Sequence, residues 1–131
     1  TRVDPKRELA RELRDASLFR QQCLLGGEWR DADSGRRLVT HDPATGAPLG
    51  HVPDLGAEEV RRAVDAAALA FATWSRVTAS ERAEMLRKWY ALIIANIEDL
   101  ARILTAEQGK PLAESRGEVK MAADYVLWFS E

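Results

Sequence analysis

The sequence predicts an α+β fold that is mainly α-helical and carries short β-ribbons in its first half. From Gly56 onward, apolar residues recur at steps of three and four, which is the period of an amphipathic helix. Before Gly56 the apolar runs are short and are separated by turn residues such as Gly26-Gly27. Apolar residues make up 46% of the 131 residues, which is enough for one core. We therefore expect a single segment with an N-terminal helix over residues 1–16, β-ribbons over 17–55 and a helical layer over 56–131.

The first helix is expected over Pro5–Asp15. Asp4 can accept hydrogen bonds from the first turn, and Pro5 suits the first helical position. Leu9 and Leu13 form a narrow apolar stripe among many charges. Because so short a helix is marginal without tertiary packing, a frayed terminus and a docked helix are both compatible with this pattern.

Two short hairpins should follow the first helix. Paired glycines supply the positive φ angles of a tight turn, so Gly26-Gly27 should join the first two strands. Pro43-Ala44-Thr45-Gly46 should form the turn of the second hairpin. An isolated hairpin is marginal in water, so both must lie on another part of the fold. The four expected strands are Gln21–Leu25, Glu28–Arg30, Leu38–His41 and Pro48–Val52.

Four helices are expected after the ribbons. The first should run from Ala57 to about Ser75. The second should begin after Thr78, because its hydroxyl and the Glu81 carboxylate can form a capping box. Asn96 is expected to cap the third helix.

The third helix should end at Gly109, and the fourth should run from about Leu112 to the end of the chain. Glycine adopts the left-handed conformation at low cost, and Pro111 cannot continue the hydrogen-bond ladder. The apolar pattern of the fourth helix stops in mid-course, without a glycine, asparagine or proline to close it. The residues expected to face inward are Val60, Ala63, Val64, Ala67, Phe71, Trp74, Met85, Leu86, Trp89, Leu92, Ile93, Ile97, Leu100, Ala101, Leu104, Val119, Ala122, Ala123, Val126, Leu127 and Phe129.

Composition and charge argue against several classes of function. The formal net charge of −2 gives no reason to expect nucleic acid or an anionic membrane surface as a partner. No apolar run has the length of a membrane span, and the basic start Thr1–Arg14 lacks the hydrophobic core of a signal peptide. The single cysteine, Cys23, rules out an internal disulfide and fits a reducing compartment. We therefore expect a cytoplasmic protein.

No residue pattern marks a catalytic or metal centre. Cys23 precedes Leu24-Leu25 in an expected strand, and a buried free cysteine usually serves as a small apolar residue. His41 and His51 could meet across a ribbon, but no cysteine or carboxylate cluster completes a ligand set. We therefore assign no catalytic residue and no metal ligand.

The charged residues around Gly109 also have ordinary explanations. Glu114 and Glu118 lie four apart, as on a solvated helix face. Lys110 could contact a phosphate, but the Walker pattern needs several glycines and a Ser or Thr after the lysine. No G-x-G-x-x-G follows a strand, so the sequence carries no dinucleotide fingerprint. We therefore assign no cofactor-binding residue.

The run from Thr105 to Val119 is nevertheless more specific than a helix stop requires. Its Glu107-Gln108-Gly109-Lys110-Pro111, followed by Glu114 and Gly117-Glu118, resembles the N-terminal signature of the aldehyde dehydrogenase superfamily. Asp42-Pro43-Ala44-Thr45-Gly46 is similar to the Asn-Pro-Ala-Thr-Gly turn of that family. The likeness runs from about Ser17 to the end, and it is greatest to succinate-semialdehyde dehydrogenases. The segments that carry this closer likeness are Ser17–Gln22, Gly26–Trp29, Trp89-Tyr90 and Trp128-Phe129.

This resemblance implies a part of an oxidoreductase. In complete family members a cysteine forms a thiohemiacetal with the aldehyde, hydride passes to NAD or NADP, and a glutamate activates the water that releases the acid. The matching residues lie beyond residue 131, so the resemblance gives no catalytic role to Cys23. It implies the N-terminal part of a succinate-semialdehyde dehydrogenase-like protein, within a partial cofactor-binding domain. By itself this chain is expected to be inactive and to bind no cofactor.

Two weaker implications concern side chains of this chain. Glu107 matches a position that helps some family members hold a structural cation, although a glutamate near a helix end is ordinarily just hydrated. Met121 and Tyr125 share a helix face with Trp128 and would border the aldehyde entry channel, although aromatic stripes usually face a core.

The expected partners are the remainder of the fold or, in a homo-oligomer, a second copy. An alternative function is a non-catalytic helical module that associates with itself or with a relative through uncovered apolar faces. The chain could be a natural truncation or a fragment of an ordinary enzyme.

Overall fold

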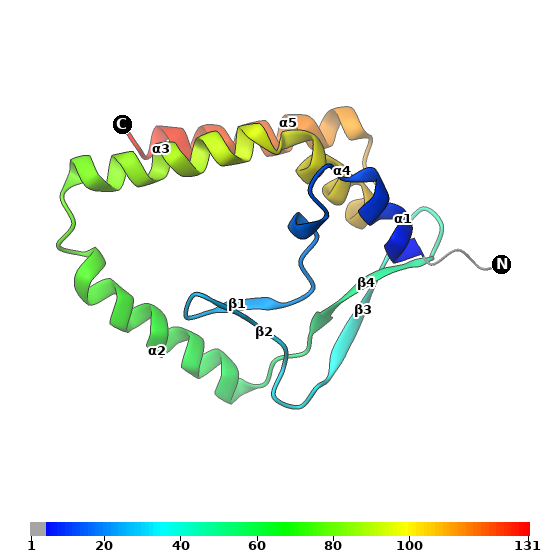
Figure 1. Ribbon diagram of the computed structural model, residues 1–131, viewed down its shortest axis with the longest axis horizontal. Helices are drawn as coiled ribbons and strands as arrows, with labels where there is room; N and C mark the ends of the chain where they lie inside the picture. The colour runs from blue at the N-terminus through cyan, green and yellow to red at the C-terminus, as the bar shows by residue number, and fades with distance from the viewer. Residues whose placement is uncertain (1–4) are drawn as a thin grey trace. The chain divides into compact units, whose positions relative to one another are not determined.

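The structure is a computed structural model that describes residues 5–131, with side chains from Leu9 onward. Its elements in order are α1 (Pro5–Glu12), η1 (Ala16–Leu18), β1 (Cys23–Leu25), β2 (Glu28–Arg30), β3 (Arg37–His41), β4 (Pro48–Pro53), α2 (Ala57–Trp74), α3 (Ala79–Ala95), α4 (Ile97–Gln108) and α5 (Leu112–Trp128). Short strands followed by long helices confirm the predicted α+β, mainly helical fold class (Figure 1). The expected cap Asp4 lies outside the described residues. Within them, no helix is both long and apolar enough to cross a membrane.

The described residues divide into two compact units. One contains the chain up to Phe19, His41–Leu49 and Thr78–Glu131, and therefore holds α1, α3, α4 and α5. The other contains Arg20–Thr40 and Gly50–Val77, and holds β1, β2 and α2. The ribbon of β3 and β4 contributes residues to both.

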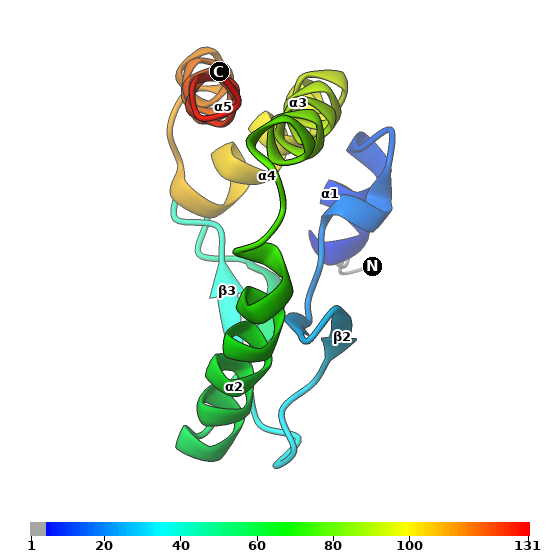
Figure 2. The same cartoon turned by 90° about the vertical axis from the view of Figure 1, so that its left-hand side faces the viewer.

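In the unit that holds the last three helices, α5 packs on both α3 and α4. α3 and α5 run side by side in opposite directions (Figures 1 and 2). Ala101 on α4 and Ala123 on α5 are completely buried. Leu9, Leu13 and Leu49 are the buried large apolar residues of this unit. The core of the unit is therefore small relative to the length of its helices.

Asp99 fixes the segment that follows α1. Its carboxylate is 3% exposed and accepts the backbone N–H groups of Arg14 at 3.0 Å and of Asp15 at 2.8 Å. The prediction that α1 reaches Asp15 is therefore wrong. α1 ends at Glu12, and Asp15 instead caps the short η1 turn by accepting the N–H of Ser17 at 2.9 Å. Sequence periodicity could not reveal these contacts, because Asp99 is separated from Arg14 by 85 positions and from Asp15 by 84.

The predicted cap of α3 is confirmed, whereas the predicted cap of α4 is wrong. The Thr78 hydroxyl accepts the N–H of Glu81 at 3.3 Å, and the Glu81 carboxylate accepts the N–H of Thr78 at 3.0 Å, so the capping box is confirmed. Asn96 stands at the start of α4 but makes no side-chain cap there. Its amide donates to the carbonyl of Leu92 at 2.8 Å and so serves the end of α3. A helix that follows another without a loop leaves carbonyls to satisfy as well as N–H groups.

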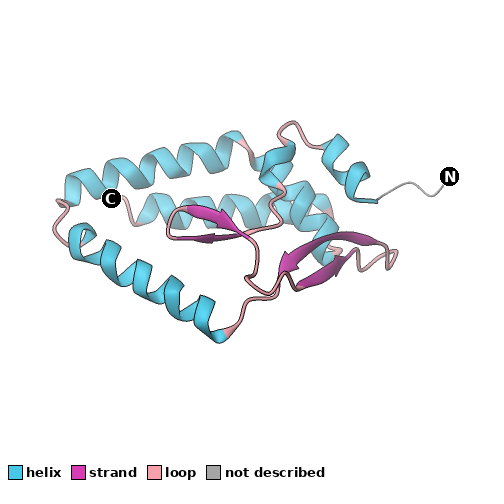
Figure 3. Ribbon diagram, turned by 60° about the horizontal axis from the view of Figure 1, so that its bottom comes forward, coloured by secondary structure: helices cyan, strands magenta, loops and turns pink. Residues whose placement is uncertain are grey.

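Two separate two-stranded ribbons lie in the chain between η1 and α2 (Figure 3). β1 and β2 are antiparallel, with Cys23 opposite Arg30 and Leu25 opposite Glu28. Gly26 and Gly27, at φ 59° and 86°, form the predicted tight turn, since positive φ at both central positions suits a hairpin. The first strand begins at Cys23 rather than at the predicted Gln21, because only three residue pairs form the ladder.

Glu59 anchors the start of α2. The side chain is buried, and its carboxylate accepts the N–H of Asp33 at 2.7 Å and the N–H of Gly56. A negative charge in the first turn also interacts favourably with the helix dipole. Glu59 therefore ties the loop after β2 to the first turn of α2, a role that its sequence position alone did not indicate.

The helical periods are confirmed, but many side chains expected to face inward are exposed. On α2 the exposed fractions of Val64 and Phe71 are 61% and 63%, and on α3 that of Leu92 is 63%. The other expected inward residues that are classed as exposed are Val60, Ala67, Trp74, Met85, Trp89, Ala122 and Phe129. The physical reason is that α2 and α3 carry more apolar surface area than the described residues of their own units can cover. Exposed apolar area on this scale is typical of a surface that takes part in interactions.

Candidate functional site

Two turns with family-like sequences lie against each other in the unit of α4 and α5. α4 ends at Gly109, which has φ 75° and donates its N–H to the carbonyl of Thr105 at 2.8 Å. A Cβ on Gly109 would lie 2.8 Å from Cγ of Pro43, closer than side-chain carbons approach. Glycine is therefore required both by its left-handed conformation and by this contact. The predicted helix stop is confirmed, and the contact with Pro43 is new.

The Pro43 turn is held by the side chain of Asp42. Its carboxylate accepts the N–H of Ala44 at 2.8 Å and the hydroxyl of Thr45 at 3.0 Å. The N–H of Gly46 donates to the carbonyl of Asp42 at 2.7 Å. The first two of these bonds lower the pKa of Asp42 below its ordinary value, with the Ala44 N–H as the larger cause. The turn is thus built to hold a charged carboxylate.

In the Asp42→Asn variant, the free energy of unfolding should therefore fall less steeply as the pH is lowered below about 4. At pH 7 it should be nearly unchanged. A group with a lowered pKa stabilises the fold above its ordinary pKa, and this contribution is lost as pH falls through the folded value, below about pH 4. An asparagine oxygen can accept the N–H of Ala44, and its amide can donate to the Thr45 hydroxyl, so both contacts can persist in a group that does not titrate. The measurement is the urea midpoint between pH 7 and pH 3. Glu81, Glu84 and Glu98 also have lowered pKa values, so some acid dependence should persist in the variant. The prediction would be contradicted if the urea midpoint of the variant fell between pH 7 and pH 3 as much as that of the unchanged protein.

The charged groups beside Gly109 have local partners. Lys110 forms an ion pair with Glu118 across the turn, while Glu114 is exposed in the first turn of α5. Glu107 is exposed as a residue, yet enough protein surrounds its carboxyl group for burial to raise its pKa. Over the described part of the chain, three or more His, Cys, Asp or Glu side chains never gather as a metal-holding group. Cation binding by Glu107 together with nearby backbone carbonyls therefore stays a prediction.

The other candidate residues are spread over the ribbons. Cys23 is half-buried in β1, and His41 and His51 lie in β3 and β4. The backbone N–H of His51 donates to the Gln21 side chain at 3.1 Å. The two histidines belong to different units, and they join no metal-holding group in residues 5–131.

The junction from β4 to α2 does not suit a dinucleotide. A pyrophosphate needs a glycine-rich strand-to-helix turn with free N–H groups at the helix start. Here the N–H of Gly56 is taken by the buried Glu59 carboxylate, which would repel an anion. These residues do not fit NAD or NADP at this junction.

The face of α5 that carries Met121 and Tyr125 is exposed and slightly hollowed. Met121, Asp124, Tyr125 and Trp128 line a shallow hollow of about 240 Å³. Trp128 is 75% exposed and Tyr125 is 58% exposed, so this face does not pack within its own unit. Sequence reasoning identified Met121, Tyr125 and Trp128 from their helical spacing but did not include Asp124. Its carboxylate forms an ion pair with Lys120 one turn earlier.

A larger hollow of about 390 Å³ lies between α1, the Pro43 turn and α4. Leu9, Leu49 and Leu112 give it apolar walls, and its charged residues Glu12 and Arg102 pair with each other at 3.6 Å. No sequence pattern indicates this hollow, because its walls come from four separate stretches of chain.

Comparison with known proteins gives one consistent result. The model of the aldehyde dehydrogenase family matches residues 29–131. The glutarate-semialdehyde dehydrogenase of Pseudomonas putida is 51% identical over 120 residues, which are 92% of this chain and 25% of that protein. The 3-sulfolactaldehyde dehydrogenase of Pseudomonas putida is 54% identical over 120 residues, which are again 92% of this chain and 25% of that protein. The crystal structure of succinate-semialdehyde dehydrogenase from Burkholderia pseudomallei matches with a TM-score of 0.88 at 53% identity, over 90% of this chain and 24% of that one. This chain therefore spans about a quarter of the length of these relatives.

Proposed function

Because the chain belongs to the aldehyde dehydrogenase family, we propose that it forms the N-terminal part of an NAD(P)-dependent enzyme that oxidises a semialdehyde to an acid. The observation that carries this proposal is its identity of 51–54% with relatives named for such substrates. In the whole enzyme the nicotinamide cofactor would accept hydride from the substrate. This chain would supply the β-ribbons, the helical layer and the exposed face of α5.

The substrate class follows from what the named aldehydes share. Glutarate semialdehyde and succinate semialdehyde carry a carboxylate at the end opposite the aldehyde, and 3-sulfolactaldehyde carries a sulfonate. We propose a short aldehyde with an anionic group, with succinate semialdehyde as the first candidate. The groups that would bind the anion are expected outside this chain, since the exposed face of α5 carries a Lys120 that is already paired with Asp124.

The exposed face of α5 would border the path of the aldehyde. Met121 and Tyr125 support this role because they are large, are more than half exposed and line a hollow. The single free thiol, Cys23, supports a reducing compartment and thus a cytoplasmic location. The uncovered faces of α2 and α3 would pack on the remainder of the fold or on a second copy.

A chimera tests this proposal. Residues of this chain would replace the matching residues of the Burkholderia pseudomallei enzyme, and the rate of NAD⁺ or NADP⁺ reduction by succinate semialdehyde would be measured. We expect activity within roughly tenfold of the parent enzyme, because the matched backbones superpose closely. A folded chimera without activity towards any acidic semialdehyde would refute the proposal.

The isolated chain should not reduce either cofactor. Positioned binding groups cannot replace an activated nucleophile, and the expected nucleophile lies outside this chain. The assay uses purified chain, succinate semialdehyde and either cofactor. Turnover that is abolished by Cys23→Ala would contradict the expectation.

A second candidate function is a non-catalytic helical interaction module. Its supporting observation is the exposure of Leu69, Trp128 and Phe129 at 77%, 75% and 74%. A module of this kind should form a defined oligomer in sedimentation experiments. A monomer that binds no apolar dye would count against it.

A further inference from the structure

α5 is attached on one side by a pair of hydroxyl groups, of which one belongs to a completely buried residue. Oγ1 of Thr105, on α4, lies 2.8 Å from Oγ of Ser115, on α5. Ser115 is completely buried, and Ala101 and Ala123 are equally buried in the same unit. Small apolar contacts allow one helix to slide or rotate on another, whereas a hydrogen bond has one short range of distances and angles. The hydroxyl pair therefore defines the position of α5 on α4.

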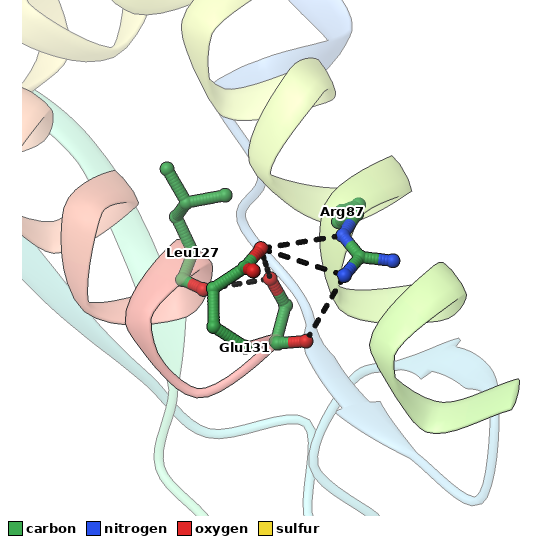
Figure 4. Close-up of polar contacts among 4 residues, drawn as sticks. Arg87, Leu127 and Glu131 are labelled. Carbon is green, nitrogen blue, oxygen red and sulfur yellow. Dashed lines mark hydrogen bonds and ion pairs between the residues drawn. The ribbon is translucent and has the colours of Figure 1, made fainter. Parts of the chain in front are cut away.

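The far end of α5 is attached to α3. Arg87 donates to the carbonyl of Ser130 at 3.5 Å and to Oε1 of Glu131 at 3.4 Å, and Oγ of Ser130 donates to the carbonyl of Leu127 at 2.6 Å (Figure 4). Ser130 is 4% exposed. A cation at a helix C-terminus also interacts favourably with the dipole. The Arg87 contacts are long, at 3.4–3.5 Å, and those with Glu131 are exposed, so the Thr105–Ser115 pair is the stricter of the two attachments.

The attached side and the hollowed side of α5 are two different parts of the surface of the same helix. At about 100° per residue, Ser115 and Ala123 lie within roughly 80° of one another around the helix. Met121, Tyr125 and Trp128 lie within roughly 60° of one another, at roughly 80–140° from Ser115 around the helix. A rotation or shift of α5 at Ser115 therefore moves the hollowed face by a similar amount, because a helix behaves as a rigid rod over this length.

We propose that Thr105 and Ser115 are positioning residues that set where the Met121–Tyr125 face stands on the path of the aldehyde. The inference rests on the proposed function, in which that face borders the substrate path. Neither hydroxyl touches the substrate; each acts through the placement of α5.

The chimera described above provides the experiment, with KM and kcat measured for succinate semialdehyde. Thr105→Val keeps the shape of the side chain but removes its hydroxyl, so that the Ser115 hydroxyl must find another partner. KM should rise roughly tenfold in this variant with kcat changed less than about twofold. Thr105→Ser keeps the hydroxyl and should leave KM within about twofold of the chimera.

Two further variants separate the explanations. Thr73→Val removes a hydroxyl that only bonds the carbonyl of Ala70, at 3.0 Å on the exposed surface of α2, and should leave KM unchanged. Tyr125→Ala changes the hollowed face directly and should raise KM at least as much as Thr105→Val.

The possible results lead to different conclusions. In one result, Thr105→Val lowers the melting temperature but leaves KM unchanged, while Tyr125→Ala raises KM. The hydroxyl pair is then only structural, and this inference is wrong. If Tyr125→Ala and Met121→Ala both leave KM unchanged in an active chimera, the channel role of α5 is wrong and this inference falls with it. An equal rise of KM in Thr105→Val and Thr105→Ser would also overturn it, because the effect would then not depend on the hydroxyl.

Discussion

Gly109→Ala should destabilise the fold by about 3 kcal/mol, the largest single effect that we expect at a turn. An alanine in the left-handed conformation costs about 1 kcal/mol by itself. The remainder comes from its Cβ, which would meet Cγ of Pro43 at 2.8 Å. The proline ring cannot rotate away as a flexible side chain would, so the backbone of one turn must move. Urea unfolding of the chimera measures the loss.

Gly35→Ala is the matched control for this substitution. Gly35 has φ 69°, but within 4 Å of its Cβ position there is no described atom of another residue. This variant should therefore lose only about 1 kcal/mol. The double variant Pro43→Ala with Gly109→Ala removes the contact and should recover part of the loss. Equal destabilisation by Gly35→Ala and Gly109→Ala would show that the Pro43 contact has no energetic effect.

Asp99→Ala, made as a single substitution, should lower the free energy of unfolding by about 3 kcal/mol. The substitution leaves the part-buried N–H groups of Arg14 and Asp15 without the carboxylate that accepts them at 3.0 and 2.8 Å. A hydrogen bond to a charged acceptor contributes about 1.5–3 kcal/mol. The same unfolding experiment measures the change, and hydrogen exchange at Asp15 should become faster because the segment after α1 is released.

Asp99→Asn and Asp65→Ala provide the comparison. Asparagine keeps one acceptor oxygen but turns an amide donor towards the second N–H, so an intermediate loss is expected. Asp65 is exposed on α2, and its replacement should change stability by less than about 0.5 kcal/mol. If Asp99→Ala behaves like Asp65→Ala, the two hydrogen bonds do not hold the N-terminal segment.

Local signals in the sequence were sufficient wherever an element is specified by its own neighbours. The capping box of Thr78 and Glu81, the turn of Gly26-Gly27 and the stop at Gly109 are all confirmed, because each depends on residues within four positions. The family resemblance is confirmed for the same reason, since its motifs are short contiguous runs. Helical periods likewise follow from spacing alone.

Tertiary contacts decided what those local signals could not. Asp99 ends α1 early, Glu59 anchors α2, and Thr105 meets Ser115 across a turn, and in each case the partner comes from a different element. A buried polar side chain is selected by the backbone groups that reach it in space, and this information is not contained in hydrophobic spacing.

By itself, then, the sequence determined the order and type of the elements and the family to which they belong. The apolar stripes of α2 and α3 were visible in it, but only the tertiary structure decided that Val64, Phe71 and Leu92 remain exposed within their units. Periodicity states which residues share a face of a helix, whereas burial depends on whether another layer of protein lies against that face.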